Sequence, residues 1–202
     1  MAGETRKREN KPRQKEPPWN EVIRYLEHIR DVSRPKYWCW PGPGARLDVN
    51  GPGAWAVDRP APDPNRVDKV FCAGVIQLGR RRLGLPVTKN VSASIYHGGT
   101  RSISDFFGGH MRDFHIGEFR RGDLAFVPFQ FRGQDDEGHV GIALGGPDDP
   151  FLQSFAWSCA TLEPGLNKRY TLRQSHESRA GGFYAKRIPR EIVWFPRTQW
   201  KK

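Results

Sequence analysis

One short stretch decides the fold expected for this chain: GHVGIALGG, residues 138 to 146. After the histidine, mostly apolar residues run to Leu144 and two glycines follow, a pattern typical of a short buried strand that ends in a turn. We therefore expect His139 to open a strand. The interior of a strand needs no imidazole, so His139 is either a hydrogen-bonded core histidine or one half of a catalytic pair.

The segments around this stretch also read as strands. The turn Arg121-Gly122-Asp123 leads into a strand over 124–129, and a polar connection over 132–138 leads to the histidine strand. A turn over 145–150 is followed by a strand over 151–157. A last strand is expected over 192–195.

Helices are expected before these strands. Apolar residues from Trp19 to Ile29 recur at helical spacing, which predicts a helix from Asn20, as its N-cap, to Val32. A second helix is expected from Cys72 to about Leu83, with Gln77 and Arg80–Arg82 outward and Gly84 at its end. A short helix over 102–107 is also indicated. Helices followed by an antiparallel meander define an α+β fold.

Length and charge limit the domain organisation and the partners. A chain of 202 residues fits one domain over 19–202, preceded by a disordered basic tail over 1–18. A Pro/Gly-rich insertion spans 35–66, and a basic extension spans 159–202. The net charge of +11 favours an anionic partner, which could be nucleic acid, anionic lipid or an anionic cell-wall polymer, and the alternative is a solvated basic surface. We expect neither a membrane span nor a signal peptide.

The cysteines are too few for a disulfide framework or a zinc motif. There are three, Cys39, Cys72 and Cys159, and their spacing matches no known zinc site. Whether Cys39 and Cys159 pair is left open. His110, Asp113 and His115 are close in sequence, but we predict surface roles for both histidines. The sequence therefore predicts no metal and no cofactor.

Cys72 is the candidate partner of His139. The start of a helix favours a thiolate, and its N–H groups can hold a developing oxyanion. A cysteine–histidine pair also needs a polar group that orients the ring. If strand 151–157 pairs antiparallel with the histidine strand, the amide oxygen of Gln153 can accept from the ring N–H. Ser154 or an aspartate is the alternative.

Four segments in this order resemble the NlpC/P60 cysteine peptidases: FCAGVIQ at 71–77, RRGDLAFVPF at 120–129, GHVGIALGG at 138–146 and FLQSF at 151–155. A fifth, YWCWPG from Tyr37, is similar to the tyrosine segment that precedes the nucleophile in that family. The resemblance covers roughly residues 20–160. It implies a papain-like fold, in which the helix that bears the cysteine packs on a small antiparallel sheet.

The resemblance also implies the roles of four residues. Cys72 would be the nucleophile, His139 the base, Gln153 the orienting residue and Tyr37 an oxyanion or substrate contact. The chain differs from the family beside the nucleophile, where Phe71 and Ala73 replace an aspartate and a serine. Those polar groups help the family to hold the free amine of a peptidoglycan stem peptide.

The function implied is that of a monomeric cysteine peptidase or amidohydrolase that cleaves peptide bonds of peptidoglycan. The chain is similar in this to the small basic lytic enzymes of phages that infect actinobacteria. Such an enzyme would be made in the cytoplasm and would act on the cell wall after release or from a virion. Two alternatives stay open: a nucleic-acid-binding or cell-wall-binding protein without catalysis, and an acyltransferase or deamidase on the same fold.

Overall fold

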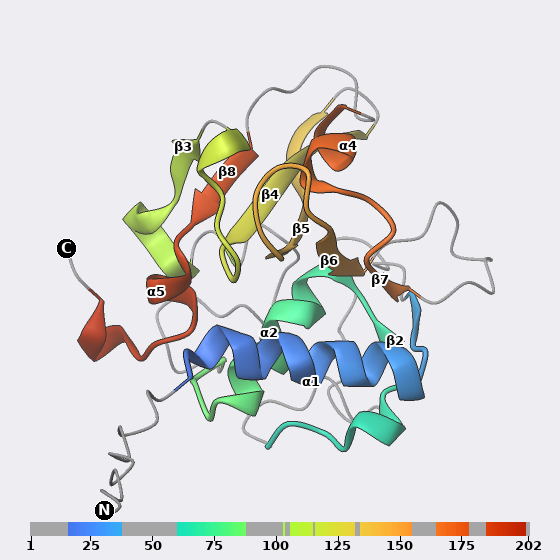
Figure 1. Cartoon of the computed structure of the whole chain (residues 1–202). Helices are drawn as coiled ribbons and strands as arrows, with labels where there is room; N and C mark the ends of the chain where they lie inside the picture. The colour runs from blue at the N-terminus through green and yellow to red at the C-terminus, as the bar shows by residue number, and fades with distance from the viewer. Residues whose placement is uncertain are drawn as a thin grey trace, which may run out of the picture.

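Helices and an antiparallel sheet build the α+β fold seen in Figure 1, a computed structural model of the chain. The structure describes residues 16–37, 60–87, 103, 106–114, 116–131, 134–154, 165–177 and 185–200. The general fold class is therefore as the sequence predicts. Most of the predicted tail, the middle of the 35–66 segment, Cys39 and Cys159 lie outside the described residues.

Helix α1 (Pro18–Val32) forms because its apolar residues recur along one face, and Val22, Ile23, Leu26 and Ile29 are fully buried. Its N-cap is Pro17 rather than Asn20, because a proline at the first helical position needs no hydrogen-bond acceptor there. The predicted cap was wrong by one turn. The predicted end of the helix, at Val32, is confirmed.

Helix α2 (Cys72–Arg82) begins at the predicted residue, and Gly84 follows its end with a φ of +65°. The prediction that these side chains point outward was wrong for Gln77, Arg80 and Arg81, whereas Arg82 is exposed as predicted. The exposed fractions of Gln77, Arg80 and Arg81 are 3%, 0% and 7%. The cause is the layering, because α2 lies between α1 and the sheet (Figure 1), and its residues from Cys72 to Arg81 are buried.

The sheet has six strands in the order β3-β8-β4-β5-β6-β7, all antiparallel. Their bounds are β3 Arg112–Phe114, β8 Ala185–Ile188, β4 Leu124–Phe131, β5 Gln134–Ala143, β6 Phe151–Ser154 and β7 Leu166–Asn167. A separate parallel pair joins β1 (Lys36–Tyr37) to β2 (Lys69–Val70). The shorter elements are η1 Pro64–Arg66, η2 Gly108–His110, η3 Ile116–Glu118, α4 Leu172–Glu177, α5 Arg190–Val193 and η4 Arg197–Gln199.

Three predicted elements differ from the structure. β5 begins at Gln134, so most of the expected polar connection is strand and His139 lies within β5. The strand expected over 192–195 was wrong, since α5 covers Ile192 and Val193 after Pro189, which favours a helix start. Of the short helix expected over 102–107, the described residues Ile103, Phe106 and Phe107 are helical.

The two faces of the sheet bury different residues. Val140, Ile142 and Leu152 belong to the large core that also contains α1 and α2. Ala143 and Phe151 belong to a second, smaller core with Phe119 and Leu172. Because side chains alternate along a strand, His139 and Gln153 project on the side of this second core.

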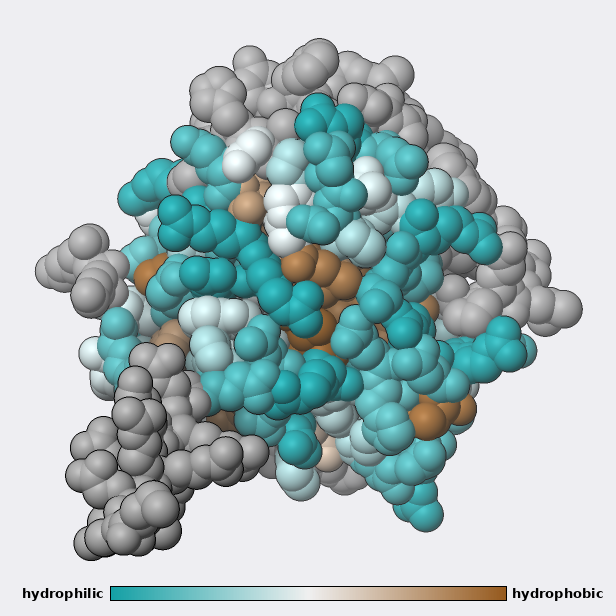
Figure 2. All heavy atoms as spheres, viewed as in Figure 1, coloured by the Kyte–Doolittle hydropathy of each residue, from teal (hydrophilic) through white to brown (hydrophobic). Residues whose placement is uncertain are grey.

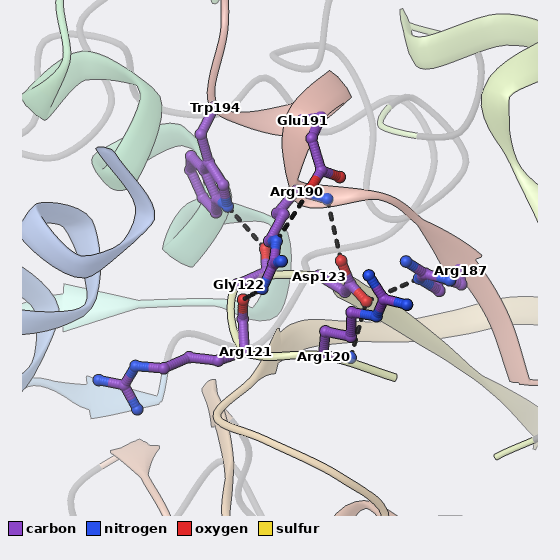
Figure 3. A network of polar contacts seen from close by, with 8 residues as sticks. All are labelled: Arg120, Arg121, Gly122, Asp123, Arg187, Arg190, Glu191 and Trp194. Atoms are coloured by element: carbon purple, nitrogen blue, oxygen red, sulfur yellow. Dashed lines mark hydrogen bonds and ion pairs between the residues drawn. The ribbon is translucent and has the colours of Figure 1, made fainter. Parts of the chain in front are cut away.

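The turn before β4 is held by a buried aspartate (Figure 3). Asp123 is 0% exposed, accepts from the backbone N–H groups of Arg120 and Arg190, and forms an ion pair with Arg187 at 2.6 Å. The indole of Trp194 donates to the carbonyl of Gly122 at 2.6 Å. This network fastens β8 and α5 to the start of β4.

The surface seen in Figure 2 is mostly hydrophilic, with small separate hydrophobic areas. Among the described residues, the one large hydrophobic side chain that is exposed is Val32, at 43%. Within the same part of the chain, no helix is long and apolar enough to cross a membrane.

Candidate functional site

The centre of the candidate site is a hydrogen bond between His139 on β5 and Gln153 on β6. Nε2 of the imidazole lies 2.6 Å from Oε1 of Gln153, and the two residues are 3% and 1% exposed. An amide oxygen can only accept, so Nε2 carries the hydrogen. In the neutral ring Nδ1 is then the proton acceptor, which is the state that a general base requires.

The backbone of β5 changes beside His139. Val127 pairs with His139, but Phe129 pairs with Asp136, so β5 holds one more residue than β4 between these pairs. Such a bulge increases the local twist and turns the neighbouring side chains. The sequence gives no sign of this bulge, since Glu137 and Gly138 read as part of a polar connection.

The ring of His139 is supported by Phe151, which it meets edge to face at a centroid distance of 6.2 Å. Phe151 can take this place because residue 141 is a glycine. A Cβ at Gly141 would lie 2.6 Å from Cζ of Phe151 and 2.7 Å from the carbonyl oxygen of Leu152. Gly141 and Phe151 therefore belong to the site, although the sequence did not single them out for it.

Cys72 is the first residue of α2 and is 8% exposed. Its N-cap, Phe71, is extended and supplies no side-chain capping bond, and the first turn of the helix contains no acidic residue. This helix start thus lacks a carboxylate that would oppose a thiolate. The sulfur is in no disulfide.

Val70, two residues before Cys72, is contacted by both β6 and β1. The hydroxyl of Ser154 donates to the carbonyl of Val70 at 2.6 Å, and the backbone of Tyr37 pairs with Val70 between β1 and β2. The structure thus brings the backbones of Tyr37, Gln153 and Cys72 to one region, although Tyr37 is far from Cys72 in the sequence. The side chain of Tyr37 lies outside the described residues.

Cys72 belongs to the large core, whereas His139 and Gln153 project on the side of the second core. Cys72 shares the large core with Val140 and Leu152, the sequence neighbours of His139 and Gln153. Because His139 and Gln153 face the second core, a thiol on α2 can meet the imidazole at the margin of the sheet, near the end of β6. Ser154, the last residue of β6, is bound to Val70 at this margin.

The other histidines and acidic residues do not form a metal site where the structure describes them. No group of three side chains suited to a metal ion occurs among the described residues. His110 is half-buried and packs edge to face on Trp200, at 5.1 Å between ring centroids. His115 and the side chain of Asp113 lie outside the described residues.

Comparison with known proteins adds no relative, since no family model, no curated protein and no solved structure matches the chain. The geometry of the site and the order of its motifs therefore carry the functional argument.

Proposed function

We propose that this protein is a cysteine peptidase or amidohydrolase of the papain-like NlpC/P60 type, acting on peptide bonds of peptidoglycan. The observation that carries the proposal is the buried 2.6 Å hydrogen bond between His139 Nε2 and Gln153 Oε1. It leaves Nδ1 as the acceptor, which is the arrangement that a thiol nucleophile requires of its base. The motif order and the start of α2 at Cys72 agree with it.

In the proposed reaction, Nδ1 of His139 takes the proton of the Cys72 thiol. The thiolate attacks the carbonyl carbon of a peptide bond, and backbone N–H groups at the start of α2 stabilise the oxyanion. The imidazolium gives its proton to the leaving amine as the C–N bond breaks, which leaves a thioester. His139 then takes a proton from water as its oxygen attacks the thioester, the acid is released with the Cys72 thiolate as leaving group, and the imidazolium returns its proton to that thiolate.

The alternation of side chains along the strands adds one requirement to the proposed reaction. His139 and Gln153 face the second core, so the Cys72 sulfur has to reach Nδ1 at the margin of the sheet rather than through its core layer. The bond between Ser154 and Val70 holds the approach to α2 at this margin. Ser154→Ala is therefore expected to lower activity without removing any reacting group.

The experiment that tests the proposal compares native protein with Cys72→Ala on purified cell walls. Turbidity follows lysis, and mass spectrometry of the released muropeptides identifies the bond. Loss of one peptide bond with native protein alone supports the proposal. Equal release by both proteins contradicts the role of Cys72, and wall binding without release by either indicates a binding protein.

A further inference from the structure

Arg80, in the last turn of α2, is a buried cation that forms no ion pair with the described residues. Its side chain is among the largest that are fully buried, at 0% exposure. Nε donates to the carbonyl of Pro86 at 3.2 Å, and Nη1 donates to the carbonyl of Val193. Nη2 is buried and has no hydrogen-bond partner in the described part of the chain.

A second guanidinium, that of Arg197 on η4, lies at the same aromatic group. The Cζ atoms of Arg80 and Arg197 are each 5.0 Å from the ring centroid of Phe106. Arg80 also lies over Phe107 at 5.3 Å, and Arg197 over Trp200 at 5.3 Å. Nη2 of Arg197 donates to the carbonyl of Phe106 at 2.6 Å.

The positive charge of this pair is not balanced by the described part of the chain. No ion pair among the described residues includes either arginine. Burial, and to a smaller extent the charge of Arg197, lowers the pKa of Arg80 to about 9. Aromatic rings and carbonyl groups offset part of the cost of burying a cation, but they supply no opposite charge.

We propose that the guanidinium groups of Arg80 and Arg197 jointly bind a phosphate group, with Nη2 of Arg80 as one of the donors. Two positive charges match a phosphate dianion, and guanidinium groups present several N–H donors to its oxygen atoms. Arg197 is exposed, so the ligand enters from its side. The ligand is either free phosphate or a phosphate ester.

This site is distinct from the proposed catalytic site. Cys72 and Arg80 are eight residues apart on the same helix, which separates them by roughly 12 Å along its axis. A phosphate bound at Arg80 would tie the end of α2 to the segments that contain Phe106 and Arg197. The site can therefore be tested whatever the outcome for Cys72.

The test is the thermal unfolding midpoint of the full chain as a function of phosphate concentration, at constant ionic strength set with sodium chloride. A saturable rise is expected, reaching about 5–10 °C at one hundred times the dissociation constant. Arg197→Gln should weaken the response at least tenfold, because one of the two cations is lost. Arg197→Lys keeps the charge and should give an intermediate response.

Arg66→Gln is the matched control, since Arg66 is an exposed arginine on η1 and should leave the response unchanged. Glycerol 1-phosphate, titrated in the same way, distinguishes binding of free phosphate from binding of a phosphate ester. A rise with both ligands indicates that esters bind, and a rise with inorganic phosphate alone indicates the free ion. The absence of any saturable rise, or the same rise in Arg197→Gln, would overturn the proposal.

Discussion

At the scale of single residues, Gln153 determines which nitrogen of His139 is left as a proton acceptor. Its oxygen fixes the hydrogen on Nε2, and because an amide is neutral it adds no charge to the pair. A carboxylate in the same place would favour the imidazolium form. The choice of an amide thus affects the pH range in which the proposed reaction runs.

Gln153→Glu is expected to raise the pKa of His139, because a carboxylate beside Nε2 stabilises the imidazolium. The acidic limb of the pH–rate profile for muropeptide release should move up by about one unit, because the neutral ring that takes the thiol proton then forms only at higher pH. Gln153→Ala serves as the control, with a rate at least about tenfold lower and no upward shift of that limb. A profile unchanged in both variants would contradict the orienting role of Gln153.

Gly141→Ala should lower both stability and activity, because the new Cβ would overlap with the ring of Phe151 and with the carbonyl of Leu152. We expect a loss of about 1–3 kcal/mol in the free energy of unfolding in urea, and a slower release of muropeptides as Phe151 shifts against His139. Gly117→Ala is the control, since no atom lies within 4 Å of its Cβ. Equal effects of the two substitutions would show that Phe151 and Leu152 do not lie close enough to Gly141 to overlap with a Cβ there.

Tyr25 gives a pH dependence of stability. Burial raises the pKa of Tyr25 to about 12, above its ordinary value of about 10, and its hydroxyl donates to the carbonyl of Pro62 at 2.8 Å. Because the folded state holds this proton more tightly, its stabilising effect is complete below pH 10 and is lost as the pH rises to 12. In Tyr25→Phe, the decline of the urea midpoint between pH 10 and 12 should be shallower. An equal decline would contradict the assignment.

At the scale of elements, the two long helices could be predicted because their apolar periodicity is local. What the sequence could not show is that segments distant in the chain cover the end of α2. Nothing in RRR, residues 80 to 82, indicates that its first arginine is fully buried, because burial there depends on Val193 and Phe106 from distant segments. The strand β8 has four residues and no apolar alternation, so the pattern of AKRI did not predict it.

The network around Asp123 joins β4, β8 and α5. Its loss should therefore lower the free energy of unfolding by more than the loss of an ordinary surface ion pair does. Asp123→Asn leaves Arg187 without its carboxylate, and we expect a loss of about 3–5 kcal/mol in the free energy of unfolding in urea. Asp148→Asn is the matched control, because the pair of Asp148 with Arg173 is exposed and should contribute about 1 kcal/mol or less. Similar losses in both variants would contradict a structural role for the buried network.

At the scale of the whole molecule, the general fold class and the central hairpins could be predicted from the sequence. The pairing of β8 with the other edge of β4 could not. The contact between His139 and Gln153 could be expected because a short turn joins their strands, so local geometry sets the register. The pairing of Tyr37 with Val70 joins the beginning of the Pro/Gly-rich segment over 35–66 to a strand that follows this segment. No local pattern encodes such a contact, nor the position of β8 between β3 and β4.

The position of β8 has a consequence for synthesis on the ribosome. β4 and β5 emerge from the ribosome before β8 and can pair at once, but the other edge of β4 keeps its backbone groups open until residues 185–188 arrive. Open strand edges recruit other chains, so this nascent state is the one most exposed to aggregation. β8, the last strand of the sheet to be translated, is also the strand that covers this edge of β4. A protease that removed β8 would expose the same edge again and return the molecule to the aggregation-prone state.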